Sequence, residues 1–167
     1  MNLQFYFEKL QSHEEFKNFK RENSKAYLSS VFISIDKEKS NNDVHFDFFL
    51  PEKKEIISFQ MNDEIKKIPL ENFNNSILEK ISKNLDIDFD KIESLILERM
   101  EKEKMKNKIQ KIILSLQKNS EKEFLSGTIF ISMLGLIKII FDLEKMEIVD
   151  FEKKSIMDIL NIVKKKS

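Results

Sequence analysis

A short hairpin pattern that occurs twice constrains the fold more than any other feature of this sequence. In residues 48–60 a phenylalanine-containing apolar run leads into a charged corner, and a second apolar run follows. Residues 143–152 repeat the pattern 92 positions later (143 minus 51). Apolar runs around a short polar corner are typical of a tight β-hairpin, and a repeat indicates an internal duplication. The matched residues are Glu52, Lys53, Glu55, Ile56 and Phe59 in the first copy and Glu144, Lys145, Glu147, Ile148 and Phe151 in the second.

Alternation of apolar and polar residues predicts eight strands. In residues 26–36 we expect Tyr27, Val31, Ile33 and Ile35 on one face and Leu28, Ser30, Phe32 and Ser34 on the other, because side chains of a strand point alternately to its two faces. Gly135 suits a tight turn that requires a positive φ. The remaining strands are expected at 44–50, 54–61, 64–69, 109–118, 123–133, 136–142 and 146–151.

Apolar residues at helical spacing predict helices before, between and after these strands. Residues 3–22 read as one helix in two pieces, with Ser12 as the N-cap of the second. A short helix is expected at 74–83 and a long one at 88–107. Asp86, Asp88 and Asp90 would supply the cap and a favourable charge at the start of the long helix. A last helix is expected at 155–167.

This order of elements predicts an α+β fold built from two αββββ units, with an antiparallel sheet, amphipathic helices on one of its faces and a C-terminal helix. The units are expected at 1–72 and 73–154, followed by the helix 155–167, all within one compact domain. Matching the first strands of the two units gives a repeat spacing of 83 (109 minus 26), whereas the hairpin copies give 92. The element order therefore supports duplication better than either alignment.

The element order resembles the tandem helix-plus-four-strand units of the PepSY and β-lactamase-inhibitor-protein class. The cystatin-like class shares the single unit, and saddles of the TATA-binding type are also duplicated α/β sheets. The stretches Phe-Asp-Phe-Phe at 46–49 and Asp-Phe-Glu-Lys-Lys-Ser at 150–155 are similar to those of small uncharacterised proteins from archaea with adenine- and thymine-rich genomes. That similarity implies no activity and no catalytic residue.

The composition argues against several classes of function. The chain has 29 basic and 29 acidic residues among 167, so its net charge of zero does not favour nucleic acid or an anionic membrane. It has no cysteine, which excludes disulfides and thiol nucleophiles. The longest apolar-rich run, 127–141, is shorter than the roughly 20 residues that cross a bilayer. We therefore expect a cytoplasmic protein with no membrane association.

Candidate catalytic groups are sparse. His45 and Asp47 would share one face of a strand as an acid–base pair, but no third polar partner is evident, so a solvated strand face is the favoured interpretation. The run Asp86–Asp90 fails as a calcium loop, because Lys91 stands where that loop needs glycine and Leu97 where it needs glutamate. We expect no enzyme activity, no cofactor and no metal.

The function most consistent with these observations is a protein-interaction module, either a docking adaptor or an inhibitor. Helices on one side of the sheet leave the other side open to a partner, which would be an unidentified protein or a second copy of the chain. Two alternatives remain: a carrier whose cavity Phe46, Phe48, Phe49, Phe59 and Phe130 would line, and an accessory protein that binds RNA through 102–111 and 164–166. The candidate interaction surface comprises Ser30, Phe32, Ser34, Lys111, Ser115, Ser132 and Lys138.

Overall fold

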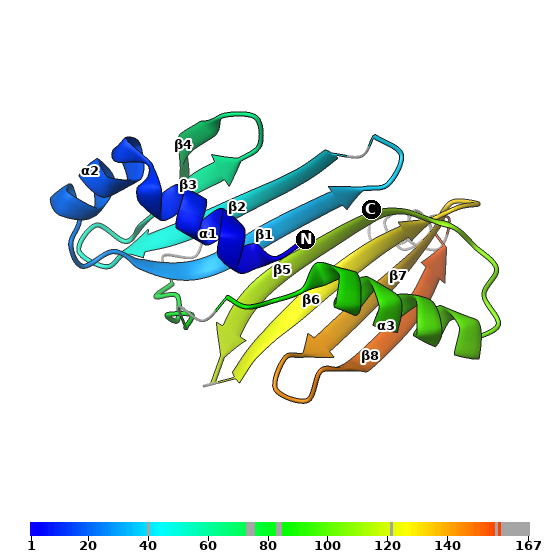
Figure 1. Cartoon of the computed structure of the whole chain (residues 1–167). Helices are drawn as coiled ribbons and strands as arrows, with labels where there is room; N and C mark the ends of the chain where they lie inside the picture. The colour runs from blue at the N-terminus through cyan, green and yellow to red at the C-terminus, as the bar shows by residue number, and fades with distance from the viewer. Residues whose placement is uncertain (40, 73–75, 83–84, 121, 156, 158–167) are drawn as a thin grey trace.

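The computed structural model describes residues 1–39, 41–72, 76–82, 85–120, 122–155 and 157. Its centre is one eight-stranded antiparallel sheet in the order β4-β3-β2-β1-β5-β6-β7-β8 (Figure 1). The strands are β1 (Tyr27–Asp36), β2 (Asn41–Leu50), β3 (Glu55–Met61), β4 (Ile65–Leu70), β5 (Ile109–Asn119), β6 (Lys122–Ile131), β7 (Gly135–Asp142) and β8 (Glu147–Ser155). The helices are α1 (Leu3–Ser12), α2 (Glu14–Glu22) and α3 (Phe89–Lys102).

Two four-stranded meanders meet at the middle of the sheet. The first strand of each meander pairs with the other, so that β1 lies antiparallel to β5 from Val31 opposite Leu116 to Asp36 opposite Lys111. The remaining strands extend outwards from this pair, and β4 and β8 form the two edges. The αββββ plan therefore occurs twice within one continuous sheet, as the sequence predicts.

The three helices of the described residues lie on one face of the sheet, so the prediction of an α+β fold with amphipathic helices on one side is confirmed (Figure 1). Most of the buried strand residues point towards the helices, for example Ile33, Phe46 and Ile129, which are fully buried. Helix α2 contributes Phe16 and Phe19 to this core. The helices are short, and isolated helices of this length are marginal in water, so this packing supplies most of their stability.

The helix ends differ in part from those expected. The break at residue 13 is confirmed, but the N-cap of α2 is His13, without a side-chain hydrogen bond, and the Ser12 hydroxyl donates instead to the carbonyl of Lys9. Asp88 caps α3 by accepting from the amide of Asp90. The short helix expected at 74–83 is wrong for its described part, since 76–82 is irregular. A last helix was expected at 155–167, but Ser155 is the final residue of β8, and residues 156 and 158–167 lie outside the described residues.

A β-bulge changes the faces expected for β1. The pairing with β2 shifts register between Leu28 and Ser30, which places one extra residue, Ser29, in β1. Leu28 therefore joins Val31 on the helix side, and Tyr27 lies on the opposite side. Strict alternation predicted the opposite faces for Leu28 and Tyr27, because it does not allow for an inserted residue.

Both hairpin copies form turns, but the two turns do not occupy equivalent positions in the duplicated units. The first copy joins β2 to β3 and the second joins β7 to β8, which are different hairpins of their meanders. Both turns end on a residue with positive φ, Lys54 (55°) and Met146 (53°). The sequence similarity therefore reflects a shared turn geometry, whereas the duplication of the plan is seen in the element order.

The turn before β7 also differs from expectation. Its positive φ values fall on Met133 (65°) and Leu134 (55°) rather than on Gly135. Gly135 has a steric role instead, because a Cβ there would lie 2.8 Å from Cγ1 of Ile131. Close approach to a neighbouring side chain is thus the reason that glycine occupies this position.

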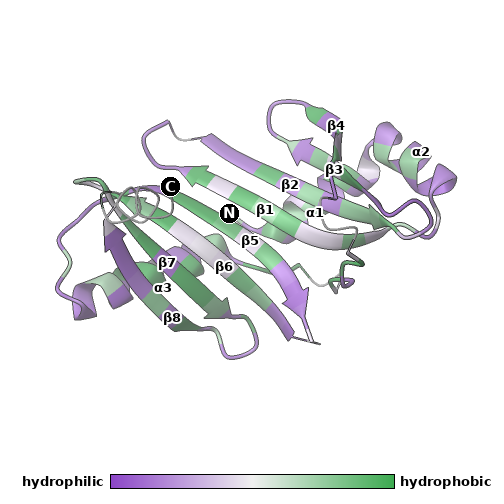
Figure 2. Ribbon diagram, turned by 180° about the vertical axis from the view of Figure 1, so that it is seen from behind, coloured by the Kyte–Doolittle hydropathy of each residue, from purple (hydrophilic) through white to green (hydrophobic). Residues whose placement is uncertain are grey.

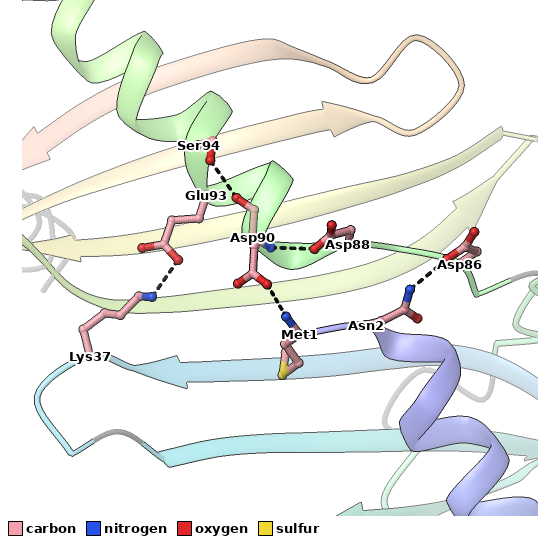
Figure 3. Close-up of polar contacts among 8 residues, drawn as sticks. All are labelled: Met1, Asn2, Lys37, Asp86, Asp88, Asp90, Glu93 and Ser94. Atoms are coloured by element: carbon pink, nitrogen blue, oxygen red, sulfur yellow. Dashed lines mark hydrogen bonds and ion pairs between the residues drawn. The ribbon is translucent and has the colours of Figure 1, made fainter.

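The two units are also joined on the helix side, where the beginnings of α1 and α3 meet (Figure 3). The amide of Leu3 donates to the carbonyl of Ile87 (3.1 Å), and the amide of Phe89 donates to the carbonyl of Met1 (3.0 Å). Beside them, Asn2 donates to a carboxylate oxygen of Asp86 (2.8 Å). These contacts fix the two helices relative to each other above the β1–β5 pair.

Candidate interaction surface

The sheet face opposite α1–α3, called here the open face, carries most of the predicted surface residues. Ser30, Phe32 and Ser34 of β1 point to it, as do Lys111 and Ser115 of β5 and Lys138 of β7, because each alternates with a residue buried against the helices. Figure 2 views the sheet from this side, with α1 and α3 behind the strands. Six of the seven predicted residues therefore share one surface.

Ser132 lies elsewhere. It follows the end of β6, where its amide donates to the carbonyl of Lys108 (2.8 Å) and its hydroxyl accepts from the amide of Lys108 (3.0 Å). Its own carbonyl accepts from the side chain of Asn107 (2.9 Å). Ser132 thus fastens the segment entering β5 to the β6–β7 turn, a role that alternation along a longer strand does not reveal.

The centre of the open face is uncharged. One cross-strand row runs through Phe32, Ser115, Ser126 and Ile140, and the next begins with Ser34, Ile113 and Thr128. Ser34 is 6% exposed, and the other six residues are partly buried. Ile113, Ser126, Thr128 and Ile140 were not among the predicted residues; alternation could have placed them on this face, but the rows that they form depend on the strand register. These two rows therefore consist of hydroxyl and apolar side chains.

Charges lie around this centre. Asp36 is paired in register with Lys111, and Lys138 with Glu152. Between β5 and β8 the surface forms a shallow hollow of about 370 Å³, with Ser126 and Thr128 among its central residues and Lys138, Asp150 and Glu152 at its edge. An uncharged centre with a charged margin is the usual anatomy of a protein interface.

A buried carboxylate lies beside this centre, on β2. One oxygen of the Asp47 carboxylate accepts a hydrogen bond from the hydroxyl of Ser30 (2.8 Å). Among the described residues, the other carboxylate oxygen and the hydroxyl of Ser58 are buried and have no hydrogen-bond partner. Burial raises the pKa of Asp47, and the neighbouring Ser58 and Ser30 hydroxyls and the charge of His45 oppose that rise. A buried carboxyl with an unused oxygen is costly unless it is protonated.

His45 does not complete a catalytic pair with Asp47. Burial lowers the pKa of His45, and its ring packs against Phe32 with 5.4 Å between ring centroids. Within the described part of the chain no hydrogen bond joins the imidazole to the Asp47 carboxylate. The two groups interact through their charges alone, so the observed geometry resembles a packed strand face more than an acid–base site.

The phenylalanines expected to line a carrier cavity separate into two groups. Phe46, Phe48 and Phe59 lie in the helix-side core, where Phe59 packs against Phe16 (5.2 Å between ring centroids). Phe49 and Phe130 belong to the open side of their strands. One continuous cavity lined by all five is therefore wrong, although Phe48 borders a separate cavity described below.

Among the described residues, no group of three or more His, Cys, Asp or Glu side chains is placed to hold a metal ion. None of the described helices has the length and apolar character needed to cross a lipid bilayer.

Comparison with known proteins assigns this chain to no family. No protein-family model matches the sequence, and no curated protein matches it significantly. Among solved structures, the crystal structure of a "putative lipoprotein" from Clostridium difficile 630 has 12% sequence identity and a TM-score of 0.49, covering 92% of this chain and 99% of that chain.

Proposed function

We propose that this chain is a non-catalytic docking module whose open face binds another protein. The observation that carries the proposal is the uncharged centre of the open face, where Phe32, Ser115 and Ser126 form a row across three strands. The partner would present a flat surface of similar character, with few charges at its middle. The open face offers groups for packing, for hydrogen bonding and for charge interactions with such a partner.

The central row offers both packing and hydrogen bonding. Phe32 provides an aromatic ring that is partly exposed, and large aromatic side chains contribute strongly when a partner covers them. The hydroxyls of Ser115 and Ser126 can donate and accept, so either polarity of a partner group is acceptable. The hydroxyl of Ser115 already accepts from the side chain of Gln117 (2.9 Å) and retains its own proton to donate.

The surrounding charges would set the orientation of the partner. Lys111 of β5 and Lys138 of β7 carry positive charge in neighbouring cross-strand rows, and Asp150 and Glu152 carry negative charge on β8. Charges at an interface margin affect the rate of association and the choice of partner more than the affinity. Binding is therefore expected to slow with salt without being abolished by it.

A pair of charge-insertion variants tests the proposal. Phe32→Glu places a carboxylate in the centre of the open face, whereas Leu97→Glu makes the same kind of change at a 49% exposed leucine of α3 on the other side of the sheet. A partner isolated with the wild-type chain should bind the Leu97→Glu variant unchanged and bind Phe32→Glu at least tenfold more weakly, because a desolvated charge costs more than 1.4 kcal/mol. Thermal unfolding of both variants checks that each is folded.

The nature of the occupant is decided by two further measurements. The mass of the purified chain at two concentrations shows whether a second copy is the partner, and Phe32→Glu should then give a monomer. A chain ending at Ser155 shows whether residues after β8 compete for the same surface. The proposal fails if a partner binds both Glu variants equally, or if the open face becomes accessible to an apolar dye only after residues 156–167 are removed.

A further inference from the structure

A second binding feature lies on the helix side, away from the open face. A cavity of about 600 Å³ opens where α1 and α2 meet the beginning of β1. Its size falls within the range of about 300–1,000 Å³ that is typical of small-molecule sites. Its lining comes from α1, α2, the segment entering β1, β2 and the irregular segment around Ile81.

The inner wall of the cavity is apolar. It is formed by Phe7 of α1, Phe16 of α2, Phe48 of β2, Leu28 and Ile81. Each is at most 6% exposed, and the rings of Phe16 and Phe48 lie 5.1 Å apart. The amide of Ile81 donates to the carbonyl of Leu28 (2.9 Å), which joins these two wall residues through their backbones. An alkyl chain is the kind of group that such a wall accepts.

The mouth of the cavity is cationic. Lys17, Lys20, Lys25 and Lys80 are among its lining residues, and no Asp or Glu is. Two of the four are partly neutralised from outside: Lys17 pairs with Glu14 (2.8 Å) and Lys25 with Glu52 (2.6 Å). The ammonium of Lys20 donates to the carbonyl of Ala26, also at the cavity.

Lys80 completes this set from the irregular segment before α3. It is exposed, and no acidic partner is recorded for it in the described ranges. The ammonium groups of Lys17, Lys20 and Lys25 are already engaged, and the Lys80 ammonium adds a positive charge beside the apolar wall. This arrangement is complementary to a molecule with a negative head and an apolar tail.

We infer that this cavity binds a single-chain amphiphilic anion, with the alkyl chain against Phe7, Phe16 and Phe48 and the carboxylate among the lysines. The inference is independent of the proposed function, because the cavity and the open face lie on opposite sides of the sheet. The net charge of zero for the whole chain gives no indication of this ligand class. The cavity itself is lined by four lysines and by no Asp or Glu.

Three ten-carbon probes separate the charge from the tail: decanoate, decanol and decyltrimethylammonium. Titration calorimetry of the full chain should give the tightest binding for decanoate, by tenfold or more over decanol, and no binding of the cation. Octanoate should bind several-fold more weakly than decanoate, since each buried methylene contributes up to about 0.8 kcal/mol. A probe that binds only as micelles is recognised by its dependence on total detergent concentration and counts against the inference.

Charge-reversal variants locate the site. Lys17→Glu combined with Lys80→Glu should weaken decanoate binding about tenfold or more, since two attractive charges beside the carboxylate become repulsive. Lys138→Glu makes the same change on the open face and should leave affinity unchanged. Ala26→Leu narrows the cavity at a wall residue that is 6% exposed and should weaken decanoate and octanoate together.

The inference is overturned if decanol binds as tightly as decanoate, if no probe binds at millimolar concentration, or if Lys138→Glu matters as much as the double variant. The Phe32→Glu variant keeps the two proposals distinct. It should lose the protein partner and still bind decanoate with wild-type affinity.

Discussion

Replacing Gly127 by alanine is expected to destabilise the fold by a steric clash that the structure locates. Gly127 lies on the helix side of β6, in register between Leu114 of β5 and Ile139 of β7. A Cβ at this position would lie 2.7 Å from Cγ1 of Ile139 and 2.8 Å from Cδ2 of Leu114. The Leu114 methyl is the end of a flexible side chain, whereas Cγ1 of Ile139 is held at a branched Cβ and cannot swing away without a rotamer change.

The magnitude follows from two opposing terms. Overpacking a filled core costs about 1–3 kcal/mol. Alanine also restricts the unfolded chain, which stabilises the fold by about 0.4–1 kcal/mol. The net loss is about 1–2 kcal/mol. Because 1 kcal/mol lowers the midpoint of a domain of this size by about 2–4 °C, Gly127→Ala should unfold about 3–6 °C below the wild-type chain.

Thermal unfolding followed by circular dichroism measures this shift, with Ser126→Ala on the open face as a control that should change the midpoint little. The Ile139→Ala variant removes the clashing atom and alone costs about 2–5 kcal/mol. In that background Gly127→Ala should become neutral or stabilising. The steric argument is refuted if Gly127→Ala costs as much with Ile139→Ala as without it, or if it stabilises the wild-type chain.

Three further predictions concern the core, a buried charge and a helix cap. Phe59→Ala should lower the free energy of unfolding in urea by about 3–5 kcal/mol, because Phe59 is fully buried and packs against the aromatic rings of α2. The control Phe5→Ala, at a 66% exposed position, should lower it by less than about 0.5 kcal/mol. Burial raises the pKa of Asp47 above its ordinary value of 3.8, so the folded chain holds the proton more tightly than the unfolded chain, and stability should fall as pH rises from about 4 through the folded pKa. Asp47→Asn should remove this dependence on pH and raise the unfolding midpoint at pH 7. An unchanged dependence on pH in the variant would contradict this cause. Asp88→Ala should cost about 1 kcal/mol through loss of the α3 cap, with Asp88→Asn nearly neutral, and equal losses in chemical unfolding would show that the cap hydrogen bond is not the cause.

The sequence was sufficient for the order and type of nearly every element because burial on one side produces a simple period. Alternating residues gave the strands from Tyr27 to Ser155 within a few positions, and the stripe through Ile92 and Ile96 gave α3. The side of the sheet that packs against α1–α3 was likewise predictable, since it takes the apolar residues of each alternation. These features depend on the average behaviour of many residues.

Features set by a single residue were not predictable in the same way. The bulge at Ser29 exchanged the faces of Tyr27 and Leu28, although the pattern around them is regular. Ile81 has the spacing of a short helix, but its amide is committed to the carbonyl of Leu28, and tertiary pairing overrides the local preference. Long-range contacts decide such positions, and they have no local signature.

The candidate interaction surface was also predictable only in part. Phe32 and Lys138 could be assigned to the open face from alternation, but the row that joins Phe32 to Ser126 depends on the register between strands. The cationic cavity was not predictable, because Lys17 and Lys80 are 63 positions apart (80 minus 17) and each sits in a lysine-rich segment.

The pairing of β1 with β5 has a consequence for how the chain reaches its native state. Every other pair of neighbouring strands is consecutive in the sequence, whereas Ile33 and Leu114 are 81 positions apart (114 minus 33). Local hairpins form within microseconds, but a contact across so long an intervening chain must be found by a wider search. Each meander can thus assemble by itself, and the rate at which the whole protein folds is governed by the encounter of their two innermost strands.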